Sequence, residues 1–314
     1  MTSTNRRDFI GALAAVSCPF ACRSDDVVPP PVLAPTRDRD LLQREIDEVP
    51  AGVMGAYLNN AAGAEELIRR YVALARLDAA FEKVMSEVKT TVVTDRPAVW
   101  FVYNMGVVVK TCEALFSIDL CHRRACEIAP LLDFAIISHN HTDHYTKRFY
   151  GEMDGRLHKT VINNFTDNYG AAFNKGVCGF SRGKRTFRMK DVTIRTYESD
   201  HNEFLRGFTM PVEVECNGYS IFHVGDTHNV DELKPSRRPD LWIHHAYCWG
   251  QGPESGRGAA HLKPRVTVVA HLQELQHPRG CARWTWKDGE VAKAAAEKAG
   301  SRHVLVPLWG DRIM

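Results

Sequence analysis

Neither sign of charge is in excess in this sequence. Its 314 residues include 40 Lys and Arg against 38 Asp and Glu, for a formal net charge of +2, and no basic run is interleaved with aromatic side chains. Nucleic acids and anionic membrane surfaces attract proteins through an extended field of positive charge. We therefore predict that the chain binds no nucleic acid.

The sequence also lacks a C-x-x-C pair, an internal repeat and a glycine-rich dinucleotide-binding motif. Its nine cysteines are scattered and odd in number, so a disulfide such as Cys121 with Cys126 stays open and no connectivity can be read. Most of them are predicted to be small buried residues. With 44% hydrophobic and 25% charged residues, the composition is that of a globular protein, and the chain is long enough for a substantial core.

The apolar run near the N-terminus is too short for a transmembrane helix. Ile10 to Ala21 falls short of the about 20 apolar residues that such a helix needs, and it follows Arg6-Arg7. This pattern predicts a Tat-type signal peptide over residues 1–22 and export by that pathway. A loose lipoprotein box ending at Cys18 predicts a lipid anchor on that cysteine. The protein is thus expected to be periplasmic or a membrane-anchored lipoprotein; the alternative is an N-terminal helix of the fold.

Three further segments follow the signal. Residues 23–40 contain four prolines among charged residues, which predicts an extended linker. Residues 41–90 are predicted to form a helical segment packed on the core, because apolar residues recur at helical spacing from Ala64 to Lys89, with a break near Arg76–Asp78. Residues 91–314 form the main domain.

The main domain alternates short apolar runs with helical patterns. Helices are predicted over His122–Ala129, Asp167–Asn174 and Asp288–Ala299. The predicted strands are Val99–Tyr103, Val107–Thr111, Ala114–Asp119, Phe134–Ile137, Thr160–Asn164, Val192–Tyr197, Val212–Glu215, Tyr219–Val224, Leu241–His245, Val266–Ala270 and His303–Pro307. Asn104-Met105-Gly106 is predicted to be the turn of a hairpin. Strands interleaved with helices, without one long parallel series, indicate two mixed sheets with helices outside.

The densest set of candidate metal ligands follows the strand at Phe134–Ile137. Four ligand-type side chains occur within six residues: His139, His141, Asp143 and His144. Imidazole and carboxylate groups suit zinc, and they also accept manganese or iron. Three other predicted strands lead into further candidates, at His201, Asp226 and His271. Since loops at strand ends are where rigid scaffolds place reactive groups, we expect these residues to form one metal site.

The run from His139 to His144 resembles the H-x-H-x-D-H hallmark of the metallo-β-lactamase superfamily. The resemblance extends from about Ala98 to Ile313, and Phe116-Ser117-Ile118-Asp119 is similar to the family's first motif, whose aspartate supports the site without binding metal. It implies an α/β fold, a four-layer αββα sandwich of two mixed β-sheets flanked by helices. Asp226 matches the aspartate that bridges two metal ions in the lactonase and phosphodiesterase branches of this superfamily. The resemblance to these branches implies a small-molecule or lipid-like substrate.

The resemblance also implies two metal ions, which we expect to be Zn²⁺. His139, His141 and His201 would hold the first ion, Asp143, His144 and a last histidine would hold the second, and Asp226 would bridge them. Two cations about 3.5–4 Å apart need such a shared anionic ligand.

The last histidine departs from the family pattern, because its usual position in the closing strand carries Trp309. We predict His271 instead, since it follows a β-branched run as the other ligands do, with Glu274 bracing it. His245 and His277 are the alternatives. His244 and His245 are adjacent on a strand, so at most one of the two faces the metals.

Hydrolysis is the predicted reaction. A metal-bridging hydroxide would attack an ester, lactone, amide or phosphodiester bond, and Asp143 would orient or relay its proton. Two alternatives are open: a di-iron or mono-iron redox enzyme of the same fold, and a non-catalytic binding protein. The glycines at 250, 252, 256 and 258 predict a flexible loop that forms either part of the pocket wall or a plain surface connection.

Overall fold

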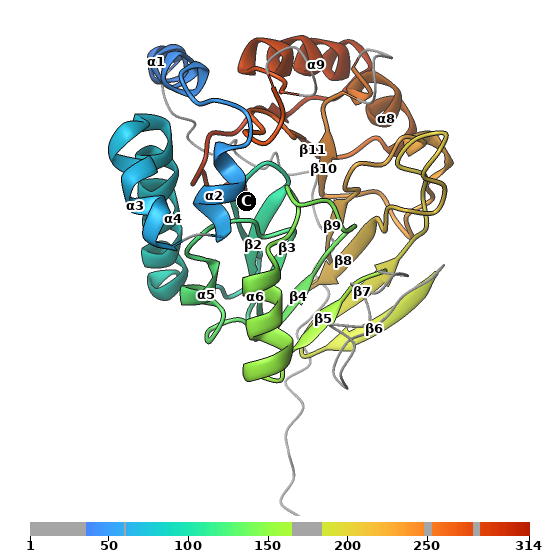
Figure 1. The fold of residues 1–314 in the computed structure, drawn as a ribbon. Coiled ribbons are helices and arrows are strands. Elements are labelled where there is room, and N and C mark those ends of the chain that lie inside the picture. Colours follow the sequence, from blue (N-terminus) through green and yellow to red (C-terminus); the bar gives the residue numbers. More distant parts are fainter. Residues whose placement is uncertain (1–35, 60, 165–183, 248–252, 279–282) are drawn as a thin grey trace, which may run out of the picture.

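A computed structural model describes residues 36–59, 61–164, 184–247, 253–278 and 283–314 (Figure 1). The predicted signal peptide, Cys18, most of the linker and the helix predicted over Asp167–Asn174 lie outside these ranges. Helix α1 (Thr36–Asp47) begins inside the segment that the prolines had predicted to be a linker.

The first sheet is built from the chain between residues 98 and 162. Its five strands, in the order β1-β2-β3-β4-β5, are β1 (Ala98–Tyr103), β2 (Gly106–Lys110), β3 (Leu115–Ile118), β4 (Phe134–Ile136) and β5 (Thr160–Ile162). The hairpins β1–β2 and β2–β3 are antiparallel, whereas β3–β4 and β4–β5 are parallel. Every residue of β1 and β4 is buried, as expected for strands covered on both faces.

The second sheet has seven strands in the order β12-β11-β10-β9-β8-β7-β6. These are β6 (Arg185–Met189), β7 (Val192–Thr196), β8 (Val212–Cys216), β9 (Tyr219–His223), β10 (Leu241–His245), β11 (Val266–Ala270) and β12 (Val304–Leu305). Pairing is antiparallel from β6 to β9 and parallel from β9 to β12. Both sheets are therefore mixed, as predicted.

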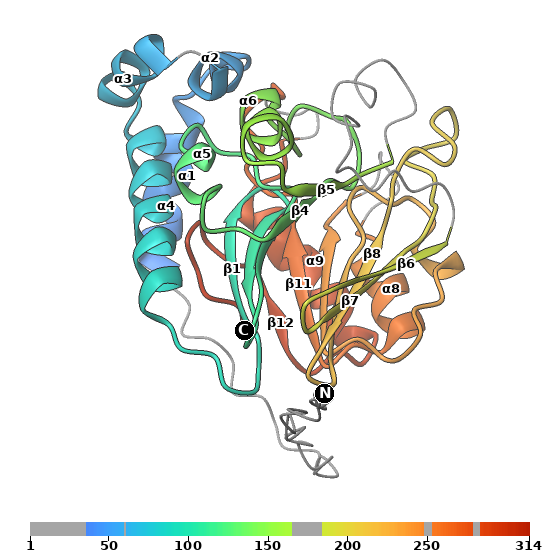
Figure 2. The same cartoon turned by 90° about the horizontal axis from the view of Figure 1, so that it is seen from below.

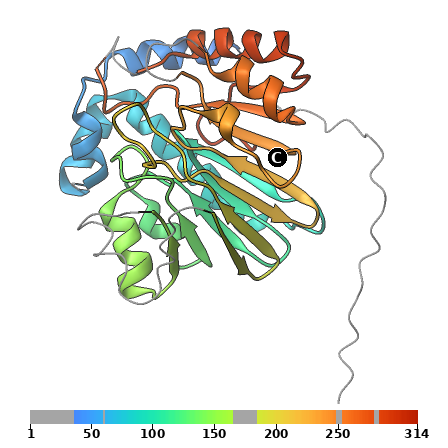
Figure 3. The same cartoon turned by 90° about the vertical axis from the view of Figure 1, so that its right-hand side faces the viewer.

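Helices cover the outer face of each sheet, which gives four layers (Figures 2 and 3). The helices are α1, α2 (Val53–Asn59), α3 (Ala61–Arg70), α4 (Val72–Thr90), α5 (Ala125–Ile128), α6 (Lys147–Gly151), a π-helical turn (Glu152–Arg156), a 3₁₀ turn (Val230–Glu232), α8 (Ser255–Leu262) and α9 (Trp286–Lys298). Helix α4 packs against β1, and α9 packs against β11 and β12. One continuous apolar core joins all layers, so the predicted αββα sandwich is confirmed.

Three local features differ from what the sequence indicated. The long N-terminal helix breaks at Tyr71, which has extended backbone between α3 and α4, and not near Arg76–Asp78. Strand β6 went unpredicted because its side chains are largely exposed and polar. Part of the predicted glycine-rich loop, including Gly256 and Gly258, lies in helix α8. A Cβ at Gly258 would lie 2.1 Å from Cη2 of Trp242, so this glycine lets the helix approach the sheet. Gly250 and Gly252 lie outside the described residues.

The cysteines at 112, 121, 126 and 216 are free thiols, so the pairing of Cys121 with Cys126 does not form. Two of these four, Cys121 and Cys216, are buried. Among the described residues, no helix is both long enough and apolar enough to cross a membrane.

Candidate metal centre

The structure brings all the predicted ligands together in two adjoining groups. The first subsite contains His139, His141, His201 and Asp226, and the second subsite contains Asp143, His144, His271 and Asp226. Within each group the candidate ligand atoms all lie within 4.8 Å of one another. The members come from loops that follow β4, β7, β9 and β11, so four strands of two sheets place them at one edge of the sandwich (Figure 1).

Asp119 anchors the loop that carries the histidine cluster. Because Ile118 pairs with Ile136 in parallel register, Asp119 lies beside the start of this loop after β4. It accepts hydrogen bonds from the Ser138 backbone N–H at 2.7 Å and from Ser138 Oγ at 2.6 Å. A third bond, at 2.9 Å, joins its Oδ2 to Nδ1 of His144. Asp119 thus supports the site from behind, in the manner that the first-motif resemblance implied.

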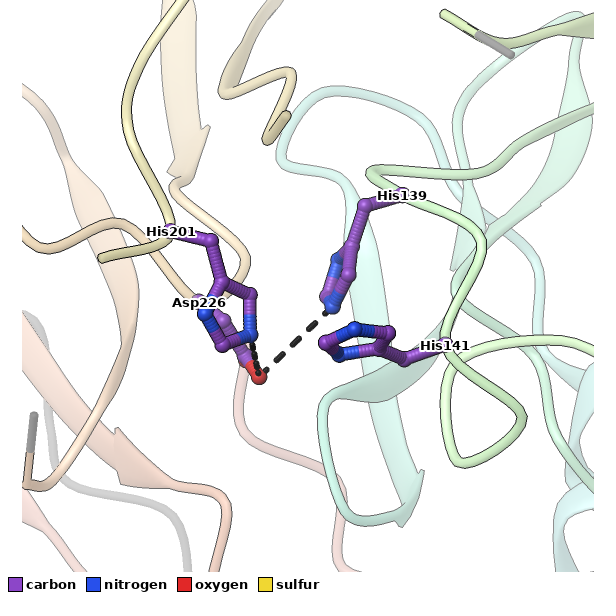
Figure 4. Close-up of side chains that lie close together, drawn as sticks. All are labelled: His139, His141, His201 and Asp226. Atoms are coloured by element: carbon purple, nitrogen blue, oxygen red, sulfur yellow. Dashed lines mark ion pairs between the residues drawn. The ribbon is translucent and has the colours of Figure 1, made fainter. Parts of the chain in front are cut away.

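The first subsite faces one oxygen of Asp226 (Figure 4). Asp226 Oδ2 lies 3.6 Å from Nε2 of His139 and 3.5 Å from Nε2 of His201, and the figure shows both histidines directed at this carboxylate. The ring of His141 closes the group, with centroids 4.7 Å from His139 and 4.6 Å from His201.

The second subsite uses both oxygens of Asp226. Nε2 of His144 lies 3.2 Å from Asp226 Oδ1, and Nε2 of His271 lies 3.4 Å from Asp226 Oδ2. Asp143 Oδ2 lies 3.1 Å from Nε2 of His271 and 3.4 Å from Nε2 of His144. Asp226 therefore stands between the two groups, as a bridging carboxylate must.

Apart from the hydrogen bond of 3.1 Å between His271 and Asp143, these separations fit a metal ion better than direct hydrogen bonds. Two ligands that each lie 2.0–2.1 Å from a tetrahedral zinc ion are about 3.3 Å from each other. Three atoms are buried and have no hydrogen-bond partner in the part of the chain that the structure describes: Nε2 of His139, Nε2 of His144 and Oδ1 of Asp226. Since buried polar atoms are almost always paired, these atoms point to a bound cation as their partner.

The hydrogen bonds of His139 and His144 also determine which ring nitrogen of each histidine faces the metal centre. Ser138 Oγ donates to Asp119, so it accepts from Nδ1 of His139 at 3.0 Å. Nδ1 of His144 likewise donates to Asp119. In both imidazoles the proton is thereby held on Nδ1, and the lone pair of Nε2 faces the centre, the usual tautomer of a metal ligand.

Burial and charge act in opposite directions on these groups. Burial, reinforced by His144, holds the pKa of His139 well below its usual value, and burial with His201 lowers the pKa of His141 to about 4, so both are neutral ligands. Burial also opposes the charged form of His271, but Asp226 and the hydrogen bond to Asp143 outweigh it and raise the pKa to about 10. The second subsite therefore attracts positive charge, which a metal ion would supply.

The structure places His271, and not His277, in the second subsite. His271 adopts φ +57°, a left-handed conformation that turns the chain out of β11. His277 lies apart from both groups, with Nδ1 2.5 Å from Oε2 of Glu274. The prediction that Glu274 braces His271 was wrong: this carboxylate instead holds His277 and accepts from the hydroxyl of Tyr103.

Neither ligand group contains His244, His245 or Trp309. His244 stacks on Trp242 on the side of α8, whereas the ring of His245 lies 3.9 Å from that of His271, so the two point to opposite faces as predicted. Trp309 stands where the resemblance would place a histidine, and its ring centroid lies 6.0 Å from that of Tyr103.

Two residues beside the centre were not predicted. Asn104 donates from Nδ2 to Oδ2 of Asp143 at 3.0 Å, although the sequence suggested only a turn residue. The ring centroid of Phe208 lies 5.0 Å from that of His141 and 5.7 Å from that of His139, so an apolar ring adjoins the first subsite. The position of Phe208, close after His201 on the same loop, was the only signal in the sequence.

That loop is fixed at its base. Ser199 and Thr209 form an antiparallel bridge, and the backbone N–H of His201 donates to the carbonyl of Leu205 at 3.0 Å. The side chain of Asn202 accepts the backbone N–H of Phe204 at 2.9 Å, and Phe204 is 85% exposed.

One further match to a catalytic pattern occurs in the sequence. Gly179-Phe180-Ser181-Arg182-Gly183 fits the G-x-S-x-G pattern of serine hydrolases, which is meaningful only at a turn between a strand and a helix. These residues lie outside the described ranges.

Comparison with solved structures identifies proteins of the same architecture. Igni18, a novel metallo hydrolase from the hyperthermophilic archaeon Ignicoccus hospitalis, is similar with a TM-score of 0.53 at 15% identity, covering 69% of this chain and 98% of that one. The metallo-beta-lactamase fold protein YhfI from Bacillus subtilis matches with a TM-score of 0.51 at 12% identity, over 69% and 98% of the two chains. CmlA, a diiron beta-hydroxylase from Streptomyces venezuelae, matches with a TM-score of 0.51 at 11% identity, over 69% and 54%. No protein-family model and no curated protein sequence matches the chain.

Proposed function

Since the chain has the metallo-β-lactamase fold, we propose that it is a hydrolase that uses two adjacent divalent metal ions. The observation that carries this proposal is the position of Asp226, whose two oxygens face ligands of both subsites across 3.2–3.6 Å. The first ion would be held by His139, His141 and His201, the second by Asp143, His144 and His271, with Asp226 shared.

Bound ions at these positions would lower the pKa of a coordinated water and polarise the bond under attack. The chain's own residues set the geometry of that reaction. Asp143 is fixed by Asn104 beside the second subsite, and we assign it the further role of orienting the attacking water. The neutral histidines limit the total negative charge, so the ions remain electrophilic.

The substrate is proposed to be an ester, lactone, amide or phosphodiester with an apolar, lipid-like group. Phe208 supports the apolar group, because its ring lies along the histidines of the first subsite. Phe204, on the same loop, is exposed and offers a second apolar side chain to such a group. Zinc is the proposed metal because nitrogen and oxygen ligands at this spacing suit it, although manganese or iron fits the same donors.

The second candidate is redox chemistry with iron at the same positions. It is supported by the donor set, since imidazole and carboxylate also bind iron, and by the likeness to a diiron hydroxylase in fold. Metal analysis separates the two proposals: an iron content near two per chain, with no hydrolysis after reconstitution with zinc, would favour redox chemistry.

The test of hydrolysis uses chelator-stripped protein reconstituted with Zn²⁺, Mn²⁺ or Fe²⁺. We expect metal-dependent cleavage of at least one of a p-nitrophenyl ester, a lactone, an anilide and bis-p-nitrophenyl phosphate. We also expect its loss in Asp226→Asn and its retention in Ser181→Ala. Cleavage that survives metal removal but disappears in Ser181→Ala would overturn the proposal in favour of a serine nucleophile.

Export by the Tat pathway, with a lipid anchor on Cys18, is a separate proposal. Its support is the twin arginine Arg6-Arg7 ahead of a short apolar run. Fractionation of cells that express the full chain tests it. We expect the protein outside the cytoplasm, in the membrane fraction, and released to the soluble fraction by Cys18→Ala; cytoplasmic protein that is unchanged by Arg6→Lys with Arg7→Lys would contradict it.

A further inference from the structure

Asn104 makes an unusual set of contacts for a residue in a two-residue hairpin turn. It follows β1 directly, since Tyr103 pairs with Gly106 across the turn, and its φ is +55°. Asparagine is among the few residues that adopt this left-handed conformation readily. Yet its side chain does not face solvent, because Asn104 is completely buried.

Both the side chain and the backbone of Asn104 form hydrogen bonds to ligands of the second subsite. Its Nδ2 donates to Oδ2 of Asp143 at 3.0 Å and also lies 3.3 Å from the backbone oxygen of Asp143. Its own carbonyl accepts the backbone N–H of His271 at 3.0 Å. One turn residue thus fixes a ligand carboxylate through its side chain and a ligand histidine through its backbone.

The turn itself is held against the metal centre. A Cβ at Gly106 would lie 2.7 Å from the backbone oxygen of Asp119, so glycine is needed for this close approach. Nε2 of His223 contacts the carbonyl of Met105 at 2.9 Å on the other side. Because the backbone is fixed on both sides, the amide of Asn104 has a defined direction.

The remaining polar atom of Asn104 argues for a functional role. Its Oδ1 is buried and has no hydrogen-bond partner among the described residues. An unpaired buried acceptor lowers stability, which a side chain present only for stability would avoid. An apolar or smaller residue would remove that cost, but it would also release Asp143.

We propose that Asn104 is a positioning residue that sets the affinity of the second subsite, independently of the first. This inference rests on the proposed binding of two metal ions. Asp143 and His271, the two ligands that Asn104 contacts, belong to the second subsite only. Loss of the amide should therefore separate the two binding events.

The decisive variant is Asn104→Gly, because glycine keeps the left-handed turn and the carbonyl that accepts from His271. Its matched control is Asn217→Gly in the β8–β9 turn, where asparagine also has a positive φ of +46°. Chelator-stripped proteins are titrated with Zn²⁺ against a chromophoric chelator, and the visible spectrum is recorded as Co²⁺ is added. Circular dichroism establishes that each protein is folded, and Asn104→Ser, whose hydroxyl can still donate, provides a second, milder variant.

We expect Asn104→Gly to bind the second ion about 10–100-fold more weakly, the usual effect of losing a group that orients a metal ligand. The first ion should bind as in the wild type, Asn104→Ser should lie between, and Asn217→Gly should change neither. Equal weakening of both ions, or no weakening of either, would overturn the role of Asn104. A wild-type protein that takes up fewer than two ions would instead overturn the proposed function, and this inference with it.

Discussion

The carboxylate of Asp119 should control both the stability of the metal-free protein and the binding of metal. It accepts three hydrogen bonds from fully buried groups, two from Ser138 and one from Nδ1 of His144. Asp119→Ala would leave three buried donors unpaired, at about 1–3 kcal/mol each, which approaches the total stability of a typical domain. The informative change is therefore Asp119→Asn, which keeps the shape and removes one acceptor.

The amide of Asp119→Asn cannot satisfy both of its neighbours. With its NH₂ toward His144, Nδ1 of that imidazole must become the acceptor, which moves the proton to Nε2 and blocks the metal-facing lone pair. With its NH₂ toward the Ser138 backbone, two donors face each other. We therefore expect a loss of about 1–3 kcal/mol in the free energy of unfolding and a 10–100-fold loss in affinity for the second ion.

Urea unfolding of the metal-free protein and zinc titration measure these two effects. Asp240→Asn is the control, because Asp240 is also buried and accepts a backbone N–H, from Ser220 at 2.9 Å, but belongs to neither subsite. It should lose stability without losing metal affinity. If Asp119→Asn unfolds at the wild-type urea concentration and binds two ions normally, the account of the support beneath the histidine loop is refuted.

Three further predictions concern packing, pH and substrate. Gly258→Ala should destabilise the protein by about 1–3 kcal/mol in urea unfolding, because the new methyl group overlaps Trp242, whereas Gly55→Ala, with no atom near the added carbon, should not. Burial lowers the pKa of His122 to about 3, below its unfolded value of about 6.5, so the unfolded chain binds the extra proton between these pH values. The stability that neutral His122 contributes is complete above pH about 6.5 and falls by up to ~1.4 kcal/mol per pH unit as the pH decreases. His122→Gln should therefore make the free energy of unfolding less dependent on pH in this range. An unchanged pH dependence would contradict the low pKa of His122. Phe208→Ala should raise KM about 10-fold for a long-chain ester, equivalent to ~1.4 kcal/mol, and leave KM for the acetyl ester within about twofold; equal changes for both would argue against an apolar wall.

The parts of the fold that sequence patterns predicted are those with strong local signals. Phe134 to Ile136 is a continuous apolar run, and it forms a fully buried strand that delivers the histidine cluster. Strands β10 and β11 also match their predicted bounds. Strand β6 lacks such a run of buried apolar side chains, since its residues are exposed or only partly buried. It is recognised as a strand only from its antiparallel pairing with β7.

The predicted ligands come together because each follows a recognisable strand. That ground favours His271, but it does not exclude His245, which also ends a predicted strand. The direction of the chain after His271 could not be predicted. His271 and Gln273 both adopt left-handed backbone conformations, at φ +57° and +59°, and this path carries Glu274 away from the metal centre. The contacts of Asn104 with Asp143 and His271 likewise depend on the way in which the two sheets pack, which no local pattern encodes.

Metal content tests most directly whether two metal ions share Asp226. Mass spectrometry on protein purified without added metal should find two ions of one metal per chain, and His271→Ala should reduce this number toward one. Fewer than half an equivalent of any metal in the wild type, even after reconstitution, would contradict the account.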